Sequence, residues 1–154
     1  MKITFLGTGT SQGIPIIGSD HPVCKSDNPK DRRLRSSVLI NWDNYNFVID
    51  CGPDFRTQML NSNCSKIDAI IYTHEHSDHV AGLDDIRPFF FKQGKIPIYA
   101  HKRVLNELKK RFYYVFDENY SYPGSPKVIE NTISSNFNIN NKEIIPLDAL
   151  HRDL

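Results

Sequence analysis

The chain has 154 residues, of which 39% are hydrophobic and 24% are charged, and its formal net charge is +1. These values are ordinary for a soluble protein, and the length suits one domain or part of one. A charge so close to neutral gives no global field that would attract nucleic acid or an acidic membrane surface. No apolar run approaches the length of a transmembrane helix, so we expect no membrane partner.

The three cysteines are Cys24, Cys51 and Cys64, an odd number at scattered positions. They do not form the pattern of a disulfide framework. The apolar run before Gly7 is also too short for a secretory signal. Both observations favour a cytoplasmic location.

The N-terminal segment from Lys2 to Leu6 alternates polar and apolar residues and predicts a strand. A glycine-rich loop follows, over residues 7–13. It matches neither a P-loop nor the dinucleotide-binding fingerprint, so phosphate binding by this loop has weak support. A turn that permits close backbone approach beside an active site is an equally good interpretation.

The connection from Ile14 to Ser36 is long for a compact domain, and such loops are usually functional or fixed by a ligand. His21 and Cys24 within it are both zinc-ligand types. Two ligands do not complete a tetrahedral site, so two interpretations stay open. One is a structural zinc at His21 and Cys24, and the other is a plain thiol beside a surface histidine.

A cationic cluster closes this connection, with Arg32, Arg33 and Arg35 as its arginines. Such a run is usually a solvated face. Near a metal centre, the same guanidinium groups can hold an anionic substrate through bidentate contacts with phosphate. We therefore consider these arginines candidate substrate-binding residues.

A β-hairpin is predicted next, with strands Ser37–Trp42 and Tyr45–Ile49. Asp50 ends the second strand, where it can orient a metal-bound histidine through the other ring nitrogen. The alternative role of Asp50 is to cap a turn. Asp54 has the character of an N-cap for a short helix, Phe55–Leu60.

The sequence Thr-His-Glu-His-Ser-Asp-His follows a predicted strand, Ile67–Tyr72, and contains three of the six histidines of the chain. Imidazole and carboxylate groups are the ligands of hydrolytic zinc, manganese and iron sites. His74 and His76 can bind one ion, and Asp78 and His79 can reach a second. A solvated polar loop is the alternative, which the clustering after an apolar strand disfavours.

The later part of the chain predicts further strands and one helix. Three consecutive aromatic residues, Phe89 to Phe91, either line a pocket or pack in the core and at its edge. We expect His101 to begin the predicted helix rather than to face the site. The predicted elements are strand Ile96–Ala100, helix Arg103–Phe112, a loop from Tyr113 to Pro126, and strands Lys127–Ile133 and Glu143–Leu147.

Taken with its strand context, the metal-ligand run resembles the His-x-His-x-Asp-His signature of the metallo-β-lactamase superfamily. The segments 5–11, 32–36, 49–54 and 82–91 also resemble a cyclic phosphodiesterase group that hydrolyses phosphoribosyl 1,2-cyclic phosphate. The resemblance implies an α+β fold, the αββα sandwich. It implies His74 and His76 as ligands of the first metal, with His151 as the third ligand.

The same resemblance assigns Asp78 and His79 to the second metal, with Asp78 also in the catalytic centre. The bridging aspartate and the final histidine of the family would lie beyond Leu154. We therefore expect residues 1–154 to form a single domain that is incomplete at its C-terminus and leaves apolar sheet surface exposed. Relatives often carry three cysteines for a zinc in the long loop, where this chain has Ser19, His21 and Cys24.

The function that the resemblance implies is metal-dependent hydrolysis of a small phosphodiester. Two divalent ions (zinc or manganese, with iron also acceptable) would activate a hydroxide by lowering the pKa of bound water. This chain alone is expected to have little or no activity, and a homodimer is an open expectation. A tRNA 3′-end processing nuclease and a non-catalytic metal-binding fragment are the alternatives, and nucleic acid and β-lactam substrates are not favoured.

Overall fold

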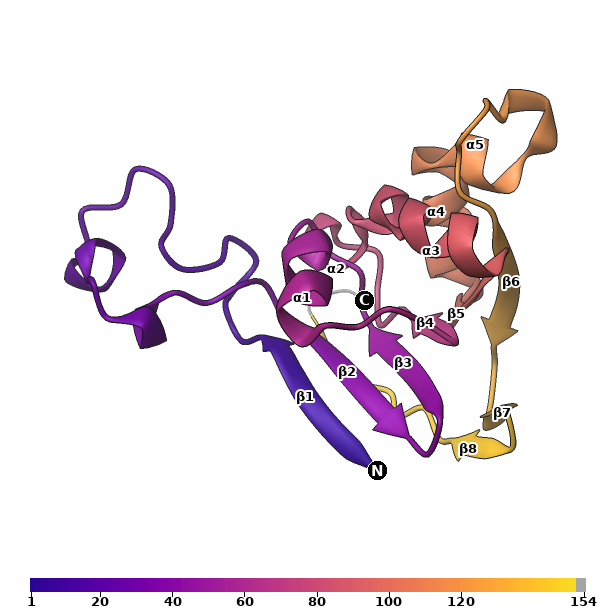
Figure 1. Ribbon diagram of the computed structural model, residues 1–154, viewed down its shortest axis with the longest axis horizontal. Coiled ribbons are helices and arrows are strands. Elements are labelled where there is room, and N and C mark those ends of the chain that lie inside the picture. The colour runs from indigo at the N-terminus through magenta and orange to yellow at the C-terminus, as the bar shows by residue number, and fades with distance from the viewer. Residues whose placement is uncertain (152–154) are drawn as a thin grey trace.

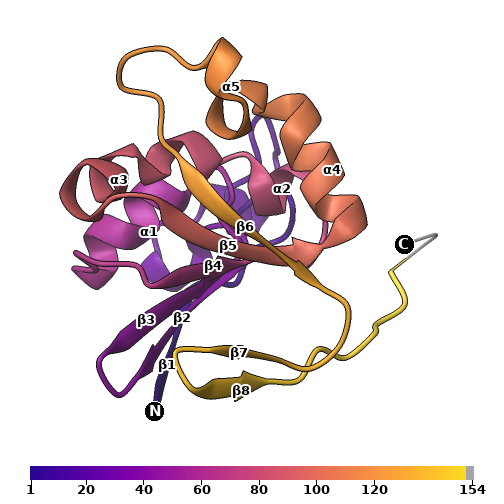
Figure 2. The same ribbon diagram turned by 90° about the vertical axis from the view of Figure 1, so that its right-hand side faces the viewer.

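The computed structural model describes residues 1–151, and its centre is a six-stranded mixed sheet with strand order β1-β2-β3-β4-β5-β6 (Figure 1). Helices cover one face of this sheet and a small hairpin crosses the other (Figure 2). The strands of the sheet are β1 (Lys2–Gly7), β2 (Ser37–Trp42), β3 (Tyr45–Ile49), β4 (Ala69–Ile71), β5 (Ile96–His101) and β6 (Val128–Ile133).

Strand direction decides where functional side chains gather. The pairs β1–β2 and β2–β3 are antiparallel, whereas β3, β4, β5 and β6 pair in parallel. Both β1 and β3 are antiparallel to β2, so the carboxyl ends of β1 and of the parallel strands lie at one edge. Loops that leave this edge are the usual place for ligand sites in such sheets.

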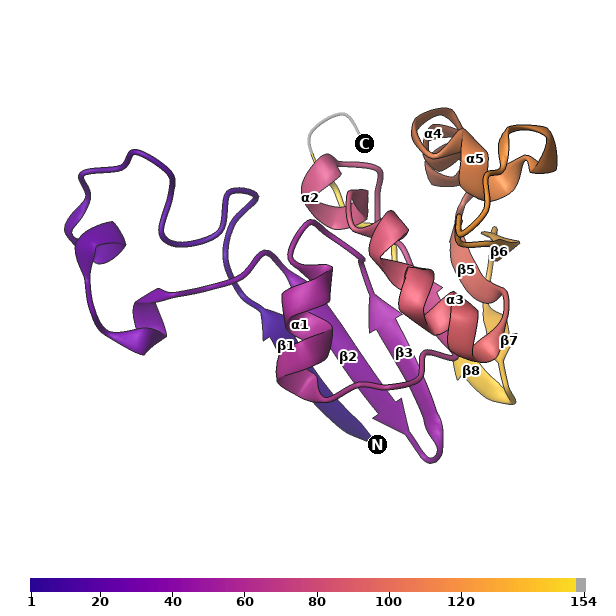
Figure 3. The same cartoon turned by 45° about the horizontal axis from the view of Figure 1, so that its top comes forward.

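The larger core lies between the sheet and the helices. Alternate strand residues such as Leu39, Val48, Ile70 and Ile98 point to this face and are buried. Figure 3 shows α1 and α3 running across the sheet. The helices are α1 (Phe55–Ser62), α2 (Ser77–Val80), α3 (Arg87–Gln93), α4 (Lys102–Arg111) and α5 (Tyr113–Phe116).

The opposite face of the sheet is only partly covered. The hairpin of β7 (Phe137–Ile139) and β8 (Lys142–Ile144) packs there, and its Ile139 joins Phe47 in a second, smaller core. The hairpin does not cover β1, whose Phe5 side chain is 72% exposed. Apolar side chains of β1 are therefore exposed among the described residues.

The predicted hairpin strands Ser37–Trp42 and Tyr45–Ile49 are confirmed at both ends. Helix α3 and strand β7 were not predicted. Pro88 lies in the first turn of α3. Three consecutive helical residues point in different directions, so Phe89 is buried while Phe91 is 64% exposed. The expected loop after α4 contains α5 and a short 3-10 turn, Glu118–Tyr120.

The connection between β1 and β2 extends away from the body of the protein (Figure 1). It contains two 3-10 turns, Pro22–Lys25 and Pro29–Asp31, each begun by a proline. In the described part of the chain, no helix is both long and apolar enough to cross a membrane.

Candidate metal centre

Backbone contacts hold the predicted metal loop against the turn that follows β3. The Cys51 N–H donates to the carbonyl of His79 at 2.9 Å, and the Gly82 N–H donates to the carbonyl of Cys51 at 2.9 Å. A Cβ atom on Gly52 would lie 2.0 Å from the Asp78 carbonyl oxygen, and one on Gly82 would lie 2.0 Å from that of Gly52. Only glycine permits this close approach, which places the histidine loop beside Asp50.

Asp50 is the buried anchor of the site. Its backbone has a left-handed φ of 61°, and its carboxylate accepts the Thr73 N–H at 2.8 Å and the Thr73 hydroxyl at 2.8 Å. The same carboxylate lies 2.7 Å from Nδ1 of His79. Asp50 therefore fixes both ends of the metal loop.

Thr73 extends this anchoring to His74. The Thr73 hydroxyl lies 3.0 Å from Nδ1 of His74. Because this hydroxyl donates its hydrogen to Asp50, its oxygen accepts a hydrogen bond from Nδ1–H of His74. The tautomer with the proton on Nδ1 leaves a lone pair on Nε2. Nε2 of His74 is buried without a hydrogen-bond partner among the described residues. A buried polar atom normally has a partner, and a metal ion would supply one here.

Three imidazoles converge at this point. One ligand nitrogen from each of His74, His76 and His151 lies within 4.8 Å of the others. The ring of His151 lies 4.9 Å from that of His74 and 5.3 Å from that of His76, measured between centroids. Residues far apart in the sequence therefore form one cluster.

Asp78 and His79 form a second pair of ligand groups beside this cluster. Oδ2 of Asp78 lies 3.1 Å from Nε2 of His79, and the His79 ring lies 4.1 Å from that of His74. The hydrogen bond with Asp50 raises the pKa of His79, whereas burial and the neighbouring imidazoles lower the pKa of His74. Neutral His74 is the form that binds a metal.

Glu75 faces away from the imidazoles, toward α4. Its carboxylate lies 3.2 Å from Nε of Arg103, and its carbonyl oxygen accepts from Arg111 at 2.6 Å. Both arginines belong to α4, so this helix holds the back of the metal loop. Sequence reasoning missed these two arginines and Thr73, because their partners are fixed by tertiary packing and no local pattern marks them.

The candidate arginines have different environments. Arg35 binds Asp54 at 3.0 Å and the carbonyl of Ser11 at 2.9 Å. Asp54 stands at the predicted N-cap position but makes no side-chain cap hydrogen bond. Arg32 and Arg33 are exposed at the border of a cavity beside β1.

His21 and Cys24 have local partners. Nδ1 of His21 accepts the Val23 N–H at 3.3 Å, and Sγ of Cys24 accepts the Ile16 N–H at 3.5 Å. Within residues 1–151, neither side chain belongs to a group of three potential metal ligands. His101 begins α4 as expected, since its Nδ1 accepts the Arg103 N–H at 3.3 Å.

The donor set of the cluster fits a divalent metal ion. Three imidazoles, one of them with a buried unpartnered nitrogen, match the pattern of three protein ligands at a catalytic zinc, which leaves a coordination position open. Hydrogen bonds on the remote ring nitrogens, as at His79, are the usual support of such ligands. A mixed sheet with this loop beyond its fourth strand agrees with the metallo-β-lactamase fold that the sequence resemblance implies.

The chain belongs to the β-lactamase superfamily. The family profile described as "Beta-lactamase superfamily domain" matches residues 45–154. A solved structure described as a new diphosphatase from the PhnP family is 38% identical, with a TM-score of 0.88 over 99% of this chain. The predicted fold class and family resemblance are thereby confirmed.

Two curated relatives are also similar. A Porphyromonas gingivalis protein named octanoyltransferase is 40% identical over 154 residues, which cover 98% of this chain. A ribonuclease Z of Methanococcus maripaludis is 35% identical over 97 residues, or 62% of this chain. The matches span 58% of the diphosphatase chain, 31% of the octanoyltransferase and 26% of the ribonuclease.

Proposed function

We propose that the protein is a metal-dependent phosphodiesterase that acts on a small phosphodiester, with a cyclic phosphate as the favoured substrate. The observation that carries the proposal is the convergence of ligand nitrogens from His74, His76 and His151 within 4.8 Å. The similarity to a diphosphatase supports chemistry at phosphorus. Zinc or manganese is the favoured metal, and iron also accepts imidazole and carboxylate ligands.

The residues of the chain would divide the work as follows. His74, His76 and His151 would hold the first ion, and Asp78 with His79 would hold a second. Asp50 would keep two imidazoles in the metal-binding tautomer, through His79 directly and through Thr73 to His74. The bound ions would lower the pKa of water and stabilise charge on phosphoryl oxygens.

Hydrolysis of a cyclic phosphate and of bis(p-nitrophenyl) phosphate tests this function. We would measure it on the product of the whole reading frame that contains these residues, with zinc or manganese added after chelation. His76→Ala should lower the metal-stimulated rate by more than about 100-fold, since loss of an indirect partner already costs 10–100-fold. Equal hydrolysis rates for the wild type and His76→Ala, or full activity of the wild type in the presence of chelator, would refute the proposal.

A ribonuclease acting at tRNA 3′ ends is the second candidate. The similarity to ribonuclease Z favours it. Such an enzyme needs a surface that grips RNA, and a net charge of +1 gives little long-range attraction. Cleavage of a 3′-extended tRNA precursor, with steeply salt-dependent binding, would favour this candidate over the small phosphodiester.

A further inference from the structure

A cavity of about 400 Å³ lies at the free edge of β1. Its volume is within the range of small-molecule sites. The proposed metal ligands do not line it. The polar and glycine residues that border it are Gly7, Thr8, Lys30, Arg32, Arg33 and Asn61.

Backbone pairing fixes the basic segment beside the glycine-rich loop. The Gly9 N–H donates to the carbonyl of Leu34 at 2.8 Å, and Ile14 and Arg33 exchange two hydrogen bonds of 2.8 Å. A Cβ atom on Gly7 would lie 2.0 Å from the carbonyl oxygen of Arg35. The glycine-rich loop thus brings three cationic side chains to one place.

The charges around this cavity are uncompensated. Lys30, Arg32 and Arg33 have no carboxylate within 4.0 Å in the part of the chain that the structure describes. Arg33 is oriented by neutral oxygens, since it donates to the Lys30 carbonyl at 3.2 Å and to the Thr8 hydroxyl at 3.4 Å. The neighbouring Arg35 differs because Asp54 neutralises it.

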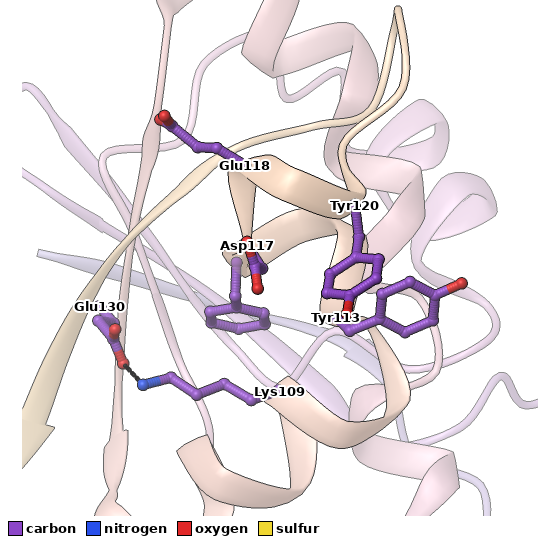
Figure 4. A pocket seen from close by; sticks show the side chains of 7 residues that line it. Lys109, Tyr113, Asp117, Glu118, Tyr120 and Glu130 are labelled. Carbon is purple, nitrogen blue, oxygen red and sulfur yellow. Dashed lines mark ion pairs between the residues drawn. The ribbon is translucent and has the colours of Figure 1, made fainter.

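A second cavity provides a contrast. It lies between α4, α5 and β6, also measures about 400 Å³, and has aromatic and acidic walls (Figure 4). Its one cation, Lys109, binds Glu130 at 2.7 Å. Asp117 and Glu118 also border it, so that cavity would repel an anion. The cavity beside β1 has no acidic residue in its lining.

We propose that the cavity beside β1 binds a phosphate group through Lys30, Arg32 and Arg33. Guanidinium groups match the geometry of phosphate oxygens, and the Thr8 hydroxyl and Asn61 amide can add hydrogen bonds. The carboxyl ends of β1 and β4 share one edge of the sheet and are three strand spacings apart, roughly 14 Å. The site would therefore hold a phosphate other than one bound at the metal loop.

Calorimetric titration with inorganic phosphate tests this site. The titration is done in chelator, so that phosphate bound through metal does not contribute. We expect one site per chain in the wild type, and Arg32→Ala should weaken binding at least about tenfold. Arg32 is exposed, so the variant should keep its circular dichroism spectrum.

Two matched variants make the result decisive. Arg56→Ala removes an exposed cation of α1 that does not border the cavity, and it should leave the affinity within about twofold. His76→Ala should also bind phosphate normally, which separates this site from the proposed hydrolase centre. Absence of binding by the wild type, equal weakening by Arg32→Ala and Arg56→Ala, or loss of binding in His76→Ala would overturn the proposal.

Discussion

Nδ1 of His79 lies 2.7 Å from Oδ2 of Asp50, a buried carboxylate that also accepts two hydrogen bonds from Thr73. One side chain therefore orients His79 directly and His74 through a hydroxyl relay. A histidine held through Nδ1 presents Nε2 to a metal. Asp50, which follows β3, thus orients His74 and His79, which follow β4.

Asp50→Asn should weaken zinc binding by about 10–100-fold, because the charge that supports both imidazoles is lost. Asparagine tolerates the left-handed φ of 61° at this position, so the backbone should be preserved. Competition with a chromogenic chelator measures the affinity. An unchanged affinity in a folded variant would contradict the anchoring role.

His74→Ala should remove bound metal from the cluster. Its buried Nε2 has no partner among the described residues, and an ion is the group that would satisfy it. Metal content after dialysis against zinc is the measurement. His101→Asn is the control, since asparagine can replace the N-cap of α4 and should retain the wild-type metal content.

Gly82→Ala should destabilise the fold by more than about 3 kcal/mol, because the new Cβ would overlap the backbone of Gly52. Ala81→Ser changes the adjacent exposed position and should cost less than about 0.5 kcal/mol. Urea unfolding gives both values. Similar midpoints for the two variants would show that the contact between the turns does not control stability.

Asp54→Ala should cost about 2 kcal/mol, since the carboxylate accepts both the Arg35 N–H and its guanidinium. The pair is partly buried, so solvent screens it less than a surface ion pair. Asp31→Ala serves as a control, because Asp31 has no ion pair in the described structure. Chemical denaturation measures both, and equal stabilities would contradict the assignment.

The three thiols should differ in reactivity. Cys51 is fully buried, and burial raises its pKa well above the ordinary value. Burial also raises the pKa of Cys64, which keeps it more protonated at pH 8 than an ordinary thiol. Alkylation followed by mass spectrometry should modify Cys24 first, Cys64 more slowly and faster as pH rises, and Cys51 only after unfolding. Early modification of Cys51 would contradict its burial.

Local patterns predicted much of the sheet. The two strands of the hairpin from Ser37 to Ile49 pair in a continuous antiparallel register. The two-residue turn between them carries Asp43 at a φ of 54°. Helix α3 was not predicted, because its aromatic run has no amphipathic spacing. Pro88 is nevertheless a residue type that is common in the first turn of a helix. Strand β7 is only three residues long, and its burial depends on contact with the distant sheet.

The metal-ligand motif was visible because chemistry requires those residue types close together in sequence. The clustering of His151 with His74 follows from tertiary structure, and only the family resemblance implies it from the sequence. Spacing could not reveal that Arg35 pairs with Asp54 while Arg32 and Arg33 border a cavity. That difference depends on how the long connection pairs with the glycine-rich loop.

Anomalous diffraction from crystals grown with zinc or manganese tests the metal centre most directly. We expect one anomalous peak, from a metal ion bound by ring nitrogens of His74, His76 and His151. Imidazoles directed into solvent with no peak between them would contradict the account.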